Sequence, residues 1–145
     1  MPVRELREGD QAAWTRMRER LWPEEGVEEA IRWRKRADTV TLIAESAPGL
    51  LVGFAEASAR PYADGCETSP VAFLEGWYVE PTHRHAGWGR MLLRAVAAWA
   101  RSRHLTELAS DSLLDDEVAI AAHLHSGFEE VERSIKFRMS LNQQE

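Results

Sequence analysis

The chain has 145 residues, of which 44% are hydrophobic and 29% charged, and its formal net charge at pH 7 is −6. This length and balance fit a single soluble globular domain, residues 1–145, large enough to bury a core. No stretch approaches the roughly 18 apolar residues of a membrane span, and the charged N-terminus does not resemble a signal peptide, so we expect a cytoplasmic protein. The negative net charge favours a cationic partner and argues against a nucleic acid.

The single cysteine, Cys66, excludes an intramolecular disulfide and a zinc site built on several thiolates, and we expect it to be a small packing residue. The charged residues are unevenly distributed along the chain. Residues 81–106 include five arginines and no acid, whereas residues 107–132 include eight acids and neither Lys nor Arg. This asymmetry favours one region that binds an anion and another that binds a cation, although solvated helix faces can also give such a pattern.

The first part of the chain predicts a short strand, two helices and then a hairpin of two strands. Residues 2–6 alternate weakly and predict a short strand, and a helical pattern follows from about residue 10 to Leu21. After Pro23, residues 24–36 predict a charged surface helix. The turn signal Ala47-Pro48-Gly49 lies between two strand patterns, which cover residues 39–45 and 50–59.

The second part alternates strands with helices. Residues 60–69 are rich in Pro, Gly, Asp and Ser and predict a loop, and the almost unbroken apolar run over 71–79 predicts a central strand. Apolar residues recur at helical spacing over 90–101, and 106–110 predicts a short strand. The remaining elements are a helix over 115–126 that Gly127 ends, and a last strand within 128–141. These elements indicate a mixed α/β sheet with helices on both faces.

The segment Arg84-His85-Ala86-Gly87-Trp88-Gly89 connects the central strand to the helix that follows. Glycines let a backbone approach a ligand closely, the first N–H groups of a helix lack intrahelical partners, and the helix dipole favours negative charge there. A pyrophosphate meets all three conditions, although two glycines can also form only a turn. The acid-free surroundings favour the anion site. The segment lacks the Lys-Ser/Thr of a Walker loop, and no Gly-x-Gly-x-x-Gly follows an N-terminal strand, which disfavours both nucleotide-binding alternatives.

The motif Arg84-x-x-Gly87-x-Gly89 resembles the signature Gln/Arg-x-x-Gly-x-Gly/Ala of the GNAT family of N-acetyltransferases, and the resemblance covers nearly the whole chain. Several further segments, in order, resemble the small, dimeric, chromosomal-type aminoglycoside 6′-N-acetyltransferases of that family. They are Leu21-Trp22-Pro23, Tyr62 to Cys66, Ser69-Pro70, Phe73-Leu74-Glu75-Gly76, Ala109-Ser110-Asp111, and Gly127-Phe128-Glu129-Glu130, while Ala122 to Phe128 resembles the last helix-to-strand junction of the GNAT family as a whole. The resemblance implies a GNAT-like, mostly antiparallel sheet, acetyl-CoA as acetyl donor, the 6′-amine of an aminoglycoside antibiotic as acceptor, antibiotic resistance, and a homodimer.

The resemblance also implies where acetyl-CoA binds. Its pyrophosphate would lie on the N–H groups of residues 85–90, and its pantetheine along the strand edge near residues 77 and 79. The expected cofactor-binding residues are Trp77, Val79, Arg84, His85, Gly87, Trp88, Gly89, Arg90 and Asp116. Asp116 stands where the family usually has an asparagine that contacts CoA.

Glu75 lies inside the apolar run over 71–79, where an unpaired carboxylate would be costly to bury. Either it pairs with a structural cation or it faces a site, and the adjacent Gly76 suggests a bulge in the strand. A primary ammonium, with a pKa of roughly 10, must lose a proton before it can attack a thioester. The resemblance implies that Glu75 anchors this cation and takes up its proton, by way of water. A backbone N–H near Trp77 or Tyr78 would polarise the thioester carbonyl, and no covalent acyl-enzyme is needed.

Other residues are expected to complete the acceptor site. Asp111 would lie beside Glu75 if the two strands that carry them are neighbours, and with Glu132 and other acids of 107–132 it would form a negatively charged cleft. Trp22 and Tyr62 would supply apolar or cation–π walls. A surface-turn aspartate and core tryptophans are the alternative interpretations.

His123 precedes Gly127 by four residues, at a position where many family members carry a tyrosine proposed to protonate the departing thiolate. A histidine can donate that proton, but a packed or exposed helix histidine is equally compatible with the pattern. The spacings His83-x-His85 and His123-x-His125 do not predict a metal site, because helix residues two apart point away from each other and no cysteine joins them. We therefore expect no metal.

Two alternatives to the aminoglycoside hypothesis remain open from the sequence. The same acids would serve an acetyltransferase whose acceptor is a polyamine or a peptide N-terminus. A non-catalytic acyl-CoA-binding module, by contrast, would bind the same ligand without releasing free CoA.

Overall fold

The computed structural model describes residues 2–142. The chain divides into two compact units, Met1–Asp111 and Ser112–Glu145, and each is described by itself. The single domain expected from chain length stays a prediction. Among residues 2–142, no helix combines the length and apolar character that a membrane crossing requires.

The first unit contains one five-stranded sheet with the strand order β1-β2-β3-β4-β5. The first four strands pair antiparallel, and β5 pairs parallel with β4. Gly49, with φ 79°, lies in the turn between the two hairpin strands, as its sequence signal predicts. The strands are β1 Val3–Glu5, β2 Thr39–Ala47, β3 Leu50–Arg60, β4 Val71–Val79 and β5 Leu108–Ala109.

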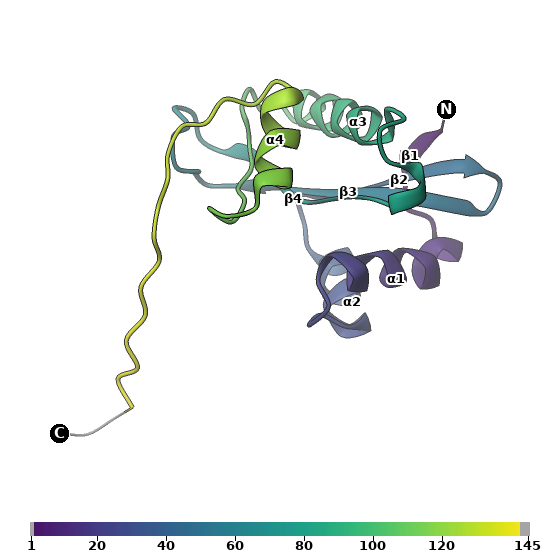
Figure 1. The fold of residues 1–145 in the computed structure, drawn as a ribbon, viewed down its shortest axis with the longest axis horizontal. Coiled ribbons are helices and arrows are strands. Elements are labelled where there is room, and N and C mark those ends of the chain that lie inside the picture. Colours follow the sequence, from purple (N-terminus) through teal and green to yellow (C-terminus); the bar gives the residue numbers. More distant parts are fainter. Residues whose placement is uncertain (1, 143–145) are drawn as a thin grey trace. The chain divides into compact units, whose positions relative to one another are not determined.

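Helices cover both faces of this sheet (Figure 1), with α1 and α2 on one face and α3 on the other. The main core cluster joins α1 and α2 to the sheet through buried side chains that include Trp14, Phe54 and Tyr78. On the opposite face, Leu92 and Val96 of α3 are fully buried. The helices are α1 Gln11–Leu21, α2 Val27–Lys35 and α3 Trp88–Ser102, and 3₁₀ turns cover Glu8–Asp10 and Pro81–His83. The mixed α/β, mostly antiparallel fold predicted from the sequence is therefore confirmed.

The first residues of two helices differ from the prediction, in each case at a residue that caps the helix. The second helix was expected from residue 24 but begins at Val27, because the N–H of Gly26 donates to the Glu29 carboxylate at 2.7 Å and closes the first turn. The third helix was expected from residue 90 but begins at Trp88, directly after Gly87. Both helices end within one residue of their predicted ends.

Strand β4 contains the bulge that Gly76 suggested. Gly76 lies opposite Glu56 and Leu74 lies opposite Ala57, so Glu75 is an extra residue with no partner of its own in the ladder. A bulge interrupts the alternation of side chains between the two faces of a strand. In β4 it allows Glu75, between two buried neighbours, to remain only partly buried.

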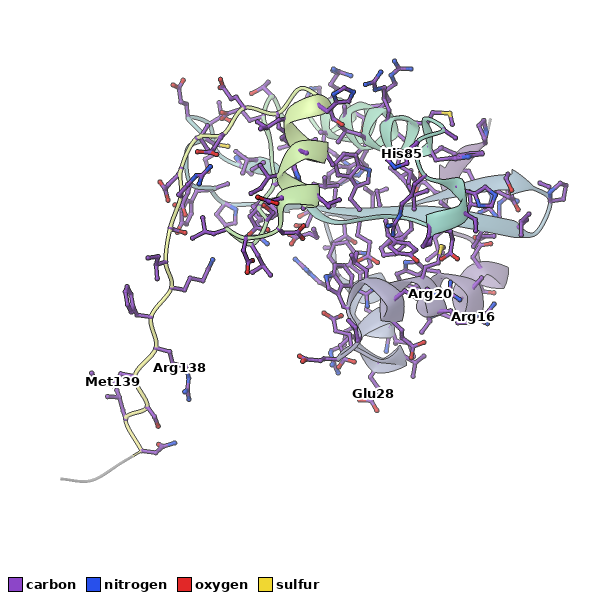
Figure 2. The ribbon with its side chains drawn as sticks, in the orientation of Figure 1. Arg16, Arg20, Glu28, His85, Arg138 and Met139 are labelled. Atoms are coloured by element: carbon purple, nitrogen blue, oxygen red, sulfur yellow. The ribbon has the colours of Figure 1, made fainter. Side chains whose placement is uncertain are left out.

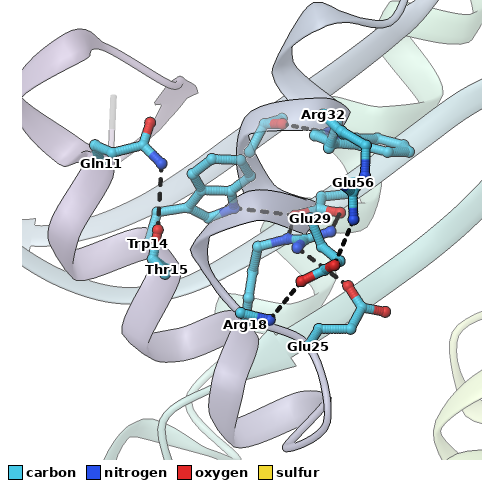
Figure 3. A network of polar contacts seen from close by, with 11 residues as sticks. Gln11, Trp14, Thr15, Arg18, Glu25, Glu29, Arg32 and Glu56 are labelled. Atoms are coloured by element: carbon cyan, nitrogen blue, oxygen red, sulfur yellow. Dashed lines mark hydrogen bonds and ion pairs between the residues drawn. The ribbon is translucent and has the colours of Figure 1, made fainter.

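A buried ion pair connects α1 to the middle of the sheet (Figure 3). Glu56 is fully buried, and its carboxylate accepts hydrogen bonds from Arg18 Nε at 2.7 Å, Arg18 Nη2 at 3.1 Å and Trp14 Nε1 at 3.0 Å. Burial raises the pKa of Glu56, while the hydrogen bonds from Arg18 and Trp14 act to lower it. Arg18 also donates to Glu25 at 3.3 Å, in the segment between α1 and α2. The pair therefore fixes both helices of this layer against β3.

The second unit contains α4, Glu117–His125, followed by extended chain. The Asp116 carboxylate accepts from the N–H of Ala119 at 3.0 Å and caps the helix, and Gly127, with φ 104°, follows its last turn as predicted.

The predicted last strand is wrong, because residues 128–142 form no strand in this structure. A strand needs a neighbouring edge for its N–H and C=O groups, and no pairing with residues 2–127 is present. The apolar residues that suggested the strand are instead largely exposed, at 56% for Val131, 72% for Ile135 and 92% for Phe137.

Candidate active site

The loop before α3 has the geometry of an anion-binding site. Gly87 adopts φ 92°, a left-handed conformation, immediately before the first helical residue. The N–H of Met91 bonds to the carbonyl of Gly87 at 3.0 Å, so the N–H groups of residues 88–90 precede the first intrahelical donor. These groups and the dipole of α3 favour a bound anion at this end of the helix.

Contacts between β4 and this loop define its position. The indole N–H of Trp77 donates to the carbonyl of Gly89 at 3.0 Å, and Arg84 Nε donates to the carbonyl of Val79 at 2.8 Å. His85, with φ 63°, carries its side chain on the loop that precedes α3 (Figure 2). The structure therefore brings together all the predicted CoA-binding residues of the first unit, from the end of β4 to the start of α3.

Gly87 gives a testable prediction, because a Cβ at this position would meet no atom within 4 Å and only its φ forbids a side chain. A non-glycine residue in the left-handed region costs about 1–2 kcal/mol, so we expect the loop of free Gly87→Ala to relax to another conformation. Restoring the left-handed conformation on binding then corresponds to a roughly 5- to 30-fold rise in the Kd of CoA. Isothermal titration with CoA measures the change. Gly9→Ala is the matched control, since a Cβ at Gly9 also meets no atom within 4 Å and its φ is not left-handed. Equal affinities of the two variants would contradict the role of the loop backbone.

Strands β4 and β5 pair over only two positions, Ala72 with Leu108 and Phe73 with Ala109. Beyond Phe73, β4 continues to Val79 without β5 beside it. Parallel strands that separate in this way leave a strand edge to which an extended amide-bearing chain can add. The predicted pantetheine position near Trp77 and Val79 lies on this part of β4.

Glu75 is the centre of the predicted acceptor side, and its side chain is 18% exposed. Its Oε2 accepts hydrogen bonds from Ser58 Oγ at 2.6 Å and from Arg60 Nε at 2.8 Å, and its Oε1 accepts from Arg60 Nη2 at 2.6 Å. The hydrogen bonds that Arg60 donates to Glu75 raise the pKa of Arg60 above its ordinary value. The sequence left open whether Glu75 pairs with a structural cation or faces a site. In the structure it pairs with Arg60 and also remains accessible to solvent.

Asp111 approaches the same arginine from the neighbouring strand. Strands β4 and β5 are neighbours, as the prediction for Asp111 required, and Asp111 follows the end of β5 by two residues. The charge of Asp111 adds to that of Glu75 in raising the pKa of Arg60. Both predicted acids therefore attract the same residue, Arg60. The sequence did not indicate that Arg60 belongs to this site.

Trp22 lies directly beside the bulge. A Cβ at Gly76 would lie 2.5 Å from Cη2 of Trp22, so only glycine allows the indole to approach the strand this closely. The ring of Trp22 packs edge-on against Phe54 at 6.1 Å and lies 4.9 Å from the guanidinium of Arg18. Trp22 thus lies against Gly76, the residue after Glu75, and packs on the core cluster that joins α1 and α2 to the sheet.

The loop after β3 carries Tyr62, which is 70% exposed. One carboxylate oxygen of Glu107 accepts from the N–H groups of Glu67 at 2.9 Å and Thr68 at 2.7 Å, which ties this loop to the segment before β5. Cys66 packs against a cluster that includes Phe73, in agreement with a packing role. Glu107 therefore orders a loop, although the sequence counted it among the acids of the acceptor region.

Three predicted site residues belong to the second unit. His123 Nδ1 lies 2.7 Å from the carbonyl of Ala119, and its ring centroid lies 5.0 Å from that of Phe128. Asp116 caps α4, and Glu132 is exposed on the extended chain. The roles of these residues stay predictions. Within residues 2–142, no cluster of three His, Cys, Asp or Glu side chains suited to a metal is present.

Comparison with known proteins identifies the class to which this fold and loop belong. Residues 4–128 match the model of the acetyltransferase (GNAT) family. The chain therefore belongs to the GNAT family of acetyltransferases, as the motif Arg84-x-x-Gly87-x-Gly89 indicated.

Within that family, the chain is similar to proteins named aminoglycoside N(6′)-acetyltransferase type 1. It is 46% identical to the one from Stenotrophomonas maltophilia, over 96% of this chain and 93% of that protein. It is 41% identical to the one from Klebsiella aerogenes, over 96% of each.

Solved structures agree with this relationship. The aminoglycoside 6′-N-acetyltransferase AAC(6′)-Ih from Acinetobacter baumannii superimposes with a TM-score of 0.90 at 33% identity, over 97% of this chain and 98% of that one. AAC(6′)-Iy, in complex with the bisubstrate analogue CoA-S-monomethyl-acetylneamine, superimposes with a TM-score of 0.88 at 33% identity, over 95% and 97% of the two chains.

Proposed function

We propose that this protein transfers the acetyl group of acetyl-CoA to the 6′-amine of aminoglycoside antibiotics by direct attack in a ternary complex, and so confers resistance to them. The observation that carries the proposal is the arrangement along β4. Its bulge holds the accessible carboxylate of Glu75, and its end leads into the anion-binding loop before α3. The names of the relatives, and the analogue bound to AAC(6′)-Iy, support the choice of donor and acceptor.

In the proposed reaction, the acceptor ammonium binds beside Glu75 and releases its proton to the carboxylate, directly or through one water molecule. The neutral amine attacks the thioester carbonyl carbon, a C–N bond forms, and the C–S bond breaks. The departing thiolate of CoA takes up a proton, for which His123 is the proposed donor. The products are the acetamide and free CoA, and the protein contributes mainly the positions of the two reactants.

The other predicted site residues would recognise the rest of the acceptor. Asp111 and Glu132 would bind further ammonium groups of the antibiotic, and Trp22 and Tyr62 would contact its rings. We also propose that Asp116 contacts CoA from the start of α4. A cytoplasmic location would give the protein access to acetyl-CoA.

Steady-state release of free thiol tests the function. We expect turnover with acetyl-CoA and neamine, and none with the analogue that has a hydroxyl in place of the 6′-amine. Turnover that ignores the 6′-amine would favour a polyamine or peptide acceptor and contradict the proposal. Binding of CoA without any thiol release would identify a non-catalytic module.

We further propose that the active protein is a homodimer, because the extended C-terminal segment presents one apolar face. Ile135, Phe137, Met139 and Leu141 alternate along it and are 72%, 92%, 82% and 86% exposed. Figure 2 shows Arg138 and Met139 leaving this segment on opposite sides. Alternation of this kind is typical of a strand that buries one face, and a second copy of the chain would cover it.

The dimer proposal predicts that Phe137→Asp shifts the protein from dimer to monomer, since a carboxylate cannot be buried there without a partner. Light scattering coupled to size-exclusion chromatography measures the mass of the species. Ser140→Asp is the control, because it makes the same charge change on the polar side of the same segment. A wild-type monomer, or a dimer unaffected by Phe137→Asp, would rule out this interface.

A further inference from the structure

Arg60 lies at the place that the proposed function reserves for the acceptor ammonium. Its guanidinium binds both oxygens of Glu75, with N–O distances of 2.8 Å and 2.6 Å. It is also attracted by Asp111, the second acid expected to bind the acceptor. Arg60 therefore already pairs with Glu75, and Asp111 adds a weaker attraction that holds the guanidinium at this place.

The carboxylate of Glu75 has little capacity left for another cation. A carboxylate offers about four lone-pair directions, and here Ser58 and Arg60 together donate three hydrogen bonds to it. An incoming ammonium can make close contact with both oxygens only if it replaces Arg60. Ser58 is fully buried, so its hydrogen bond is the one expected to persist during the exchange.

The position of the Arg60 side chain allows its guanidinium to move away from Glu75. It is the last residue of β3, next to the loop that carries Tyr62, and its side chain is 42% exposed. Its guanidinium carbon lies 3.5 Å from the ring centroid of Phe73, a neutral surface that holds the cation over the strand. Movement of the guanidinium into solvent would break its two hydrogen bonds to Glu75 and its contact with the ring of Phe73.

We propose that Arg60 is a resident counter-cation of the acceptor site, and that the acceptor must displace it from Glu75. This proposal rests on the proposed function. The exchange has the same cost for every acceptor, because each must break the same bidentate contact, and a polycationic acceptor can also bind Asp111 after the exchange. Arg60 therefore lowers the affinity of the site for every cationic acceptor, and a polycationic acceptor offsets this loss through its further ammonium groups.

The test compares Arg60→Met, which keeps an unbranched apolar side chain and removes the guanidinium, with the wild type. We expect the KM for neamine to fall about tenfold, the order of one charge-assisted hydrogen bond, and the KM for 6-amino-6-deoxyglucose, a monoamine, to fall by a similar factor. Calorimetric binding of both amines without acetyl-CoA gives a readout independent of turnover. Arg60→Lys, which keeps the charge but loses the bidentate contact, should lie between the two proteins.

The control is Arg103→Met, which makes the same charge change at an exposed ion pair with Asp38 at the end of α3. A lower kcat with an unchanged or higher KM in Arg60→Met would show that Arg60 only orients Glu75 and would overturn the proposal. A fall in KM for neamine alone would show that the acceptor does not displace Arg60 from Glu75, and would also overturn the proposal. Absence of turnover in the wild type would instead be a failure of the proposed function, and the calorimetric comparison would still decide the role of Arg60.

Discussion

We expect Glu75→Gln to lower kcat for acetyl transfer to neamine by about 10²- to 10⁴-fold, the range typical of a lost general base. Glutamine keeps the size of the side chain and can still accept a hydrogen bond from Ser58, but it cannot take up the proton of an ammonium. The Kd of CoA should be unchanged, because Glu75 lies in the middle of β4 and the anion-binding loop follows the end of that strand. Initial rates of thiol release across the accessible pH range measure the effect.

Two comparisons make this result specific. Glu19→Gln makes the same charge change at an exposed position of α1 and should leave kcat unaltered. Equal thermal midpoints for the three proteins would show that the loss in Glu75→Gln is not a loss of folding. Turnover by Glu75→Gln within a factor of three of the wild type at every pH would show that Glu75 is neither the base nor the anchor of the acceptor.

The second large effect concerns stability. Arg18→Met leaves the fully buried carboxylate of Glu56 without its charged partner, and removal of one member of a buried ion pair typically costs about 3–5 kcal/mol. Urea unfolding followed by tryptophan fluorescence should report this loss as a lower midpoint. The double variant Arg18→Met/Glu56→Leu should regain part of the stability, because it removes the buried charge as well.

The matched control is an exposed arginine–glutamate pair of the same helical layer. Arg32 and Glu29 are paired on the surface of α2, with side chains that are 64% and 38% exposed, and exposed pairs contribute about 0–1 kcal/mol. Arg32→Met should therefore change the free energy of unfolding by less than about 1 kcal/mol. A similar cost for Arg18→Met and Arg32→Met would show that the buried pair does not hold α1 to the sheet.

Much of the fold could be predicted because it depends on residues that are close together in the sequence. The apolar run, interrupted only at Glu75 and Gly76, gave the bounds of β4, Val71–Val79, without error, since a strand covered on both faces has no polar side. The loop before α3 and the end of α4 at Gly127 could be predicted because both depend on glycines with left-handed φ angles. The bulge could be expected because a carboxylate beside a glycine interrupts an otherwise apolar strand.

What could not be predicted depends on partners that are distant in the sequence. Arg60 stands at the start of a predicted loop, and nothing in its own segment shows that it will bind Glu75, fifteen residues away on another strand. The buried acid Glu56 did leave a signal, because it interrupts an apolar strand as Glu75 does, but its partner Arg18 lies on a helix. The last strand was predicted from an alternation that this structure leaves unpaired.

We propose above that this protein moves the acetyl group of acetyl-CoA to the 6′-amine of an aminoglycoside. The most direct test of this proposal is the structure of the product formed from neamine, determined by mass spectrometry and two-dimensional NMR. We expect a singly acetylated product with the acetamide at the 6′-nitrogen, together with one equivalent of free CoA. An acetamide at any other nitrogen, or recovery of unmodified neamine after prolonged incubation, would contradict the proposal.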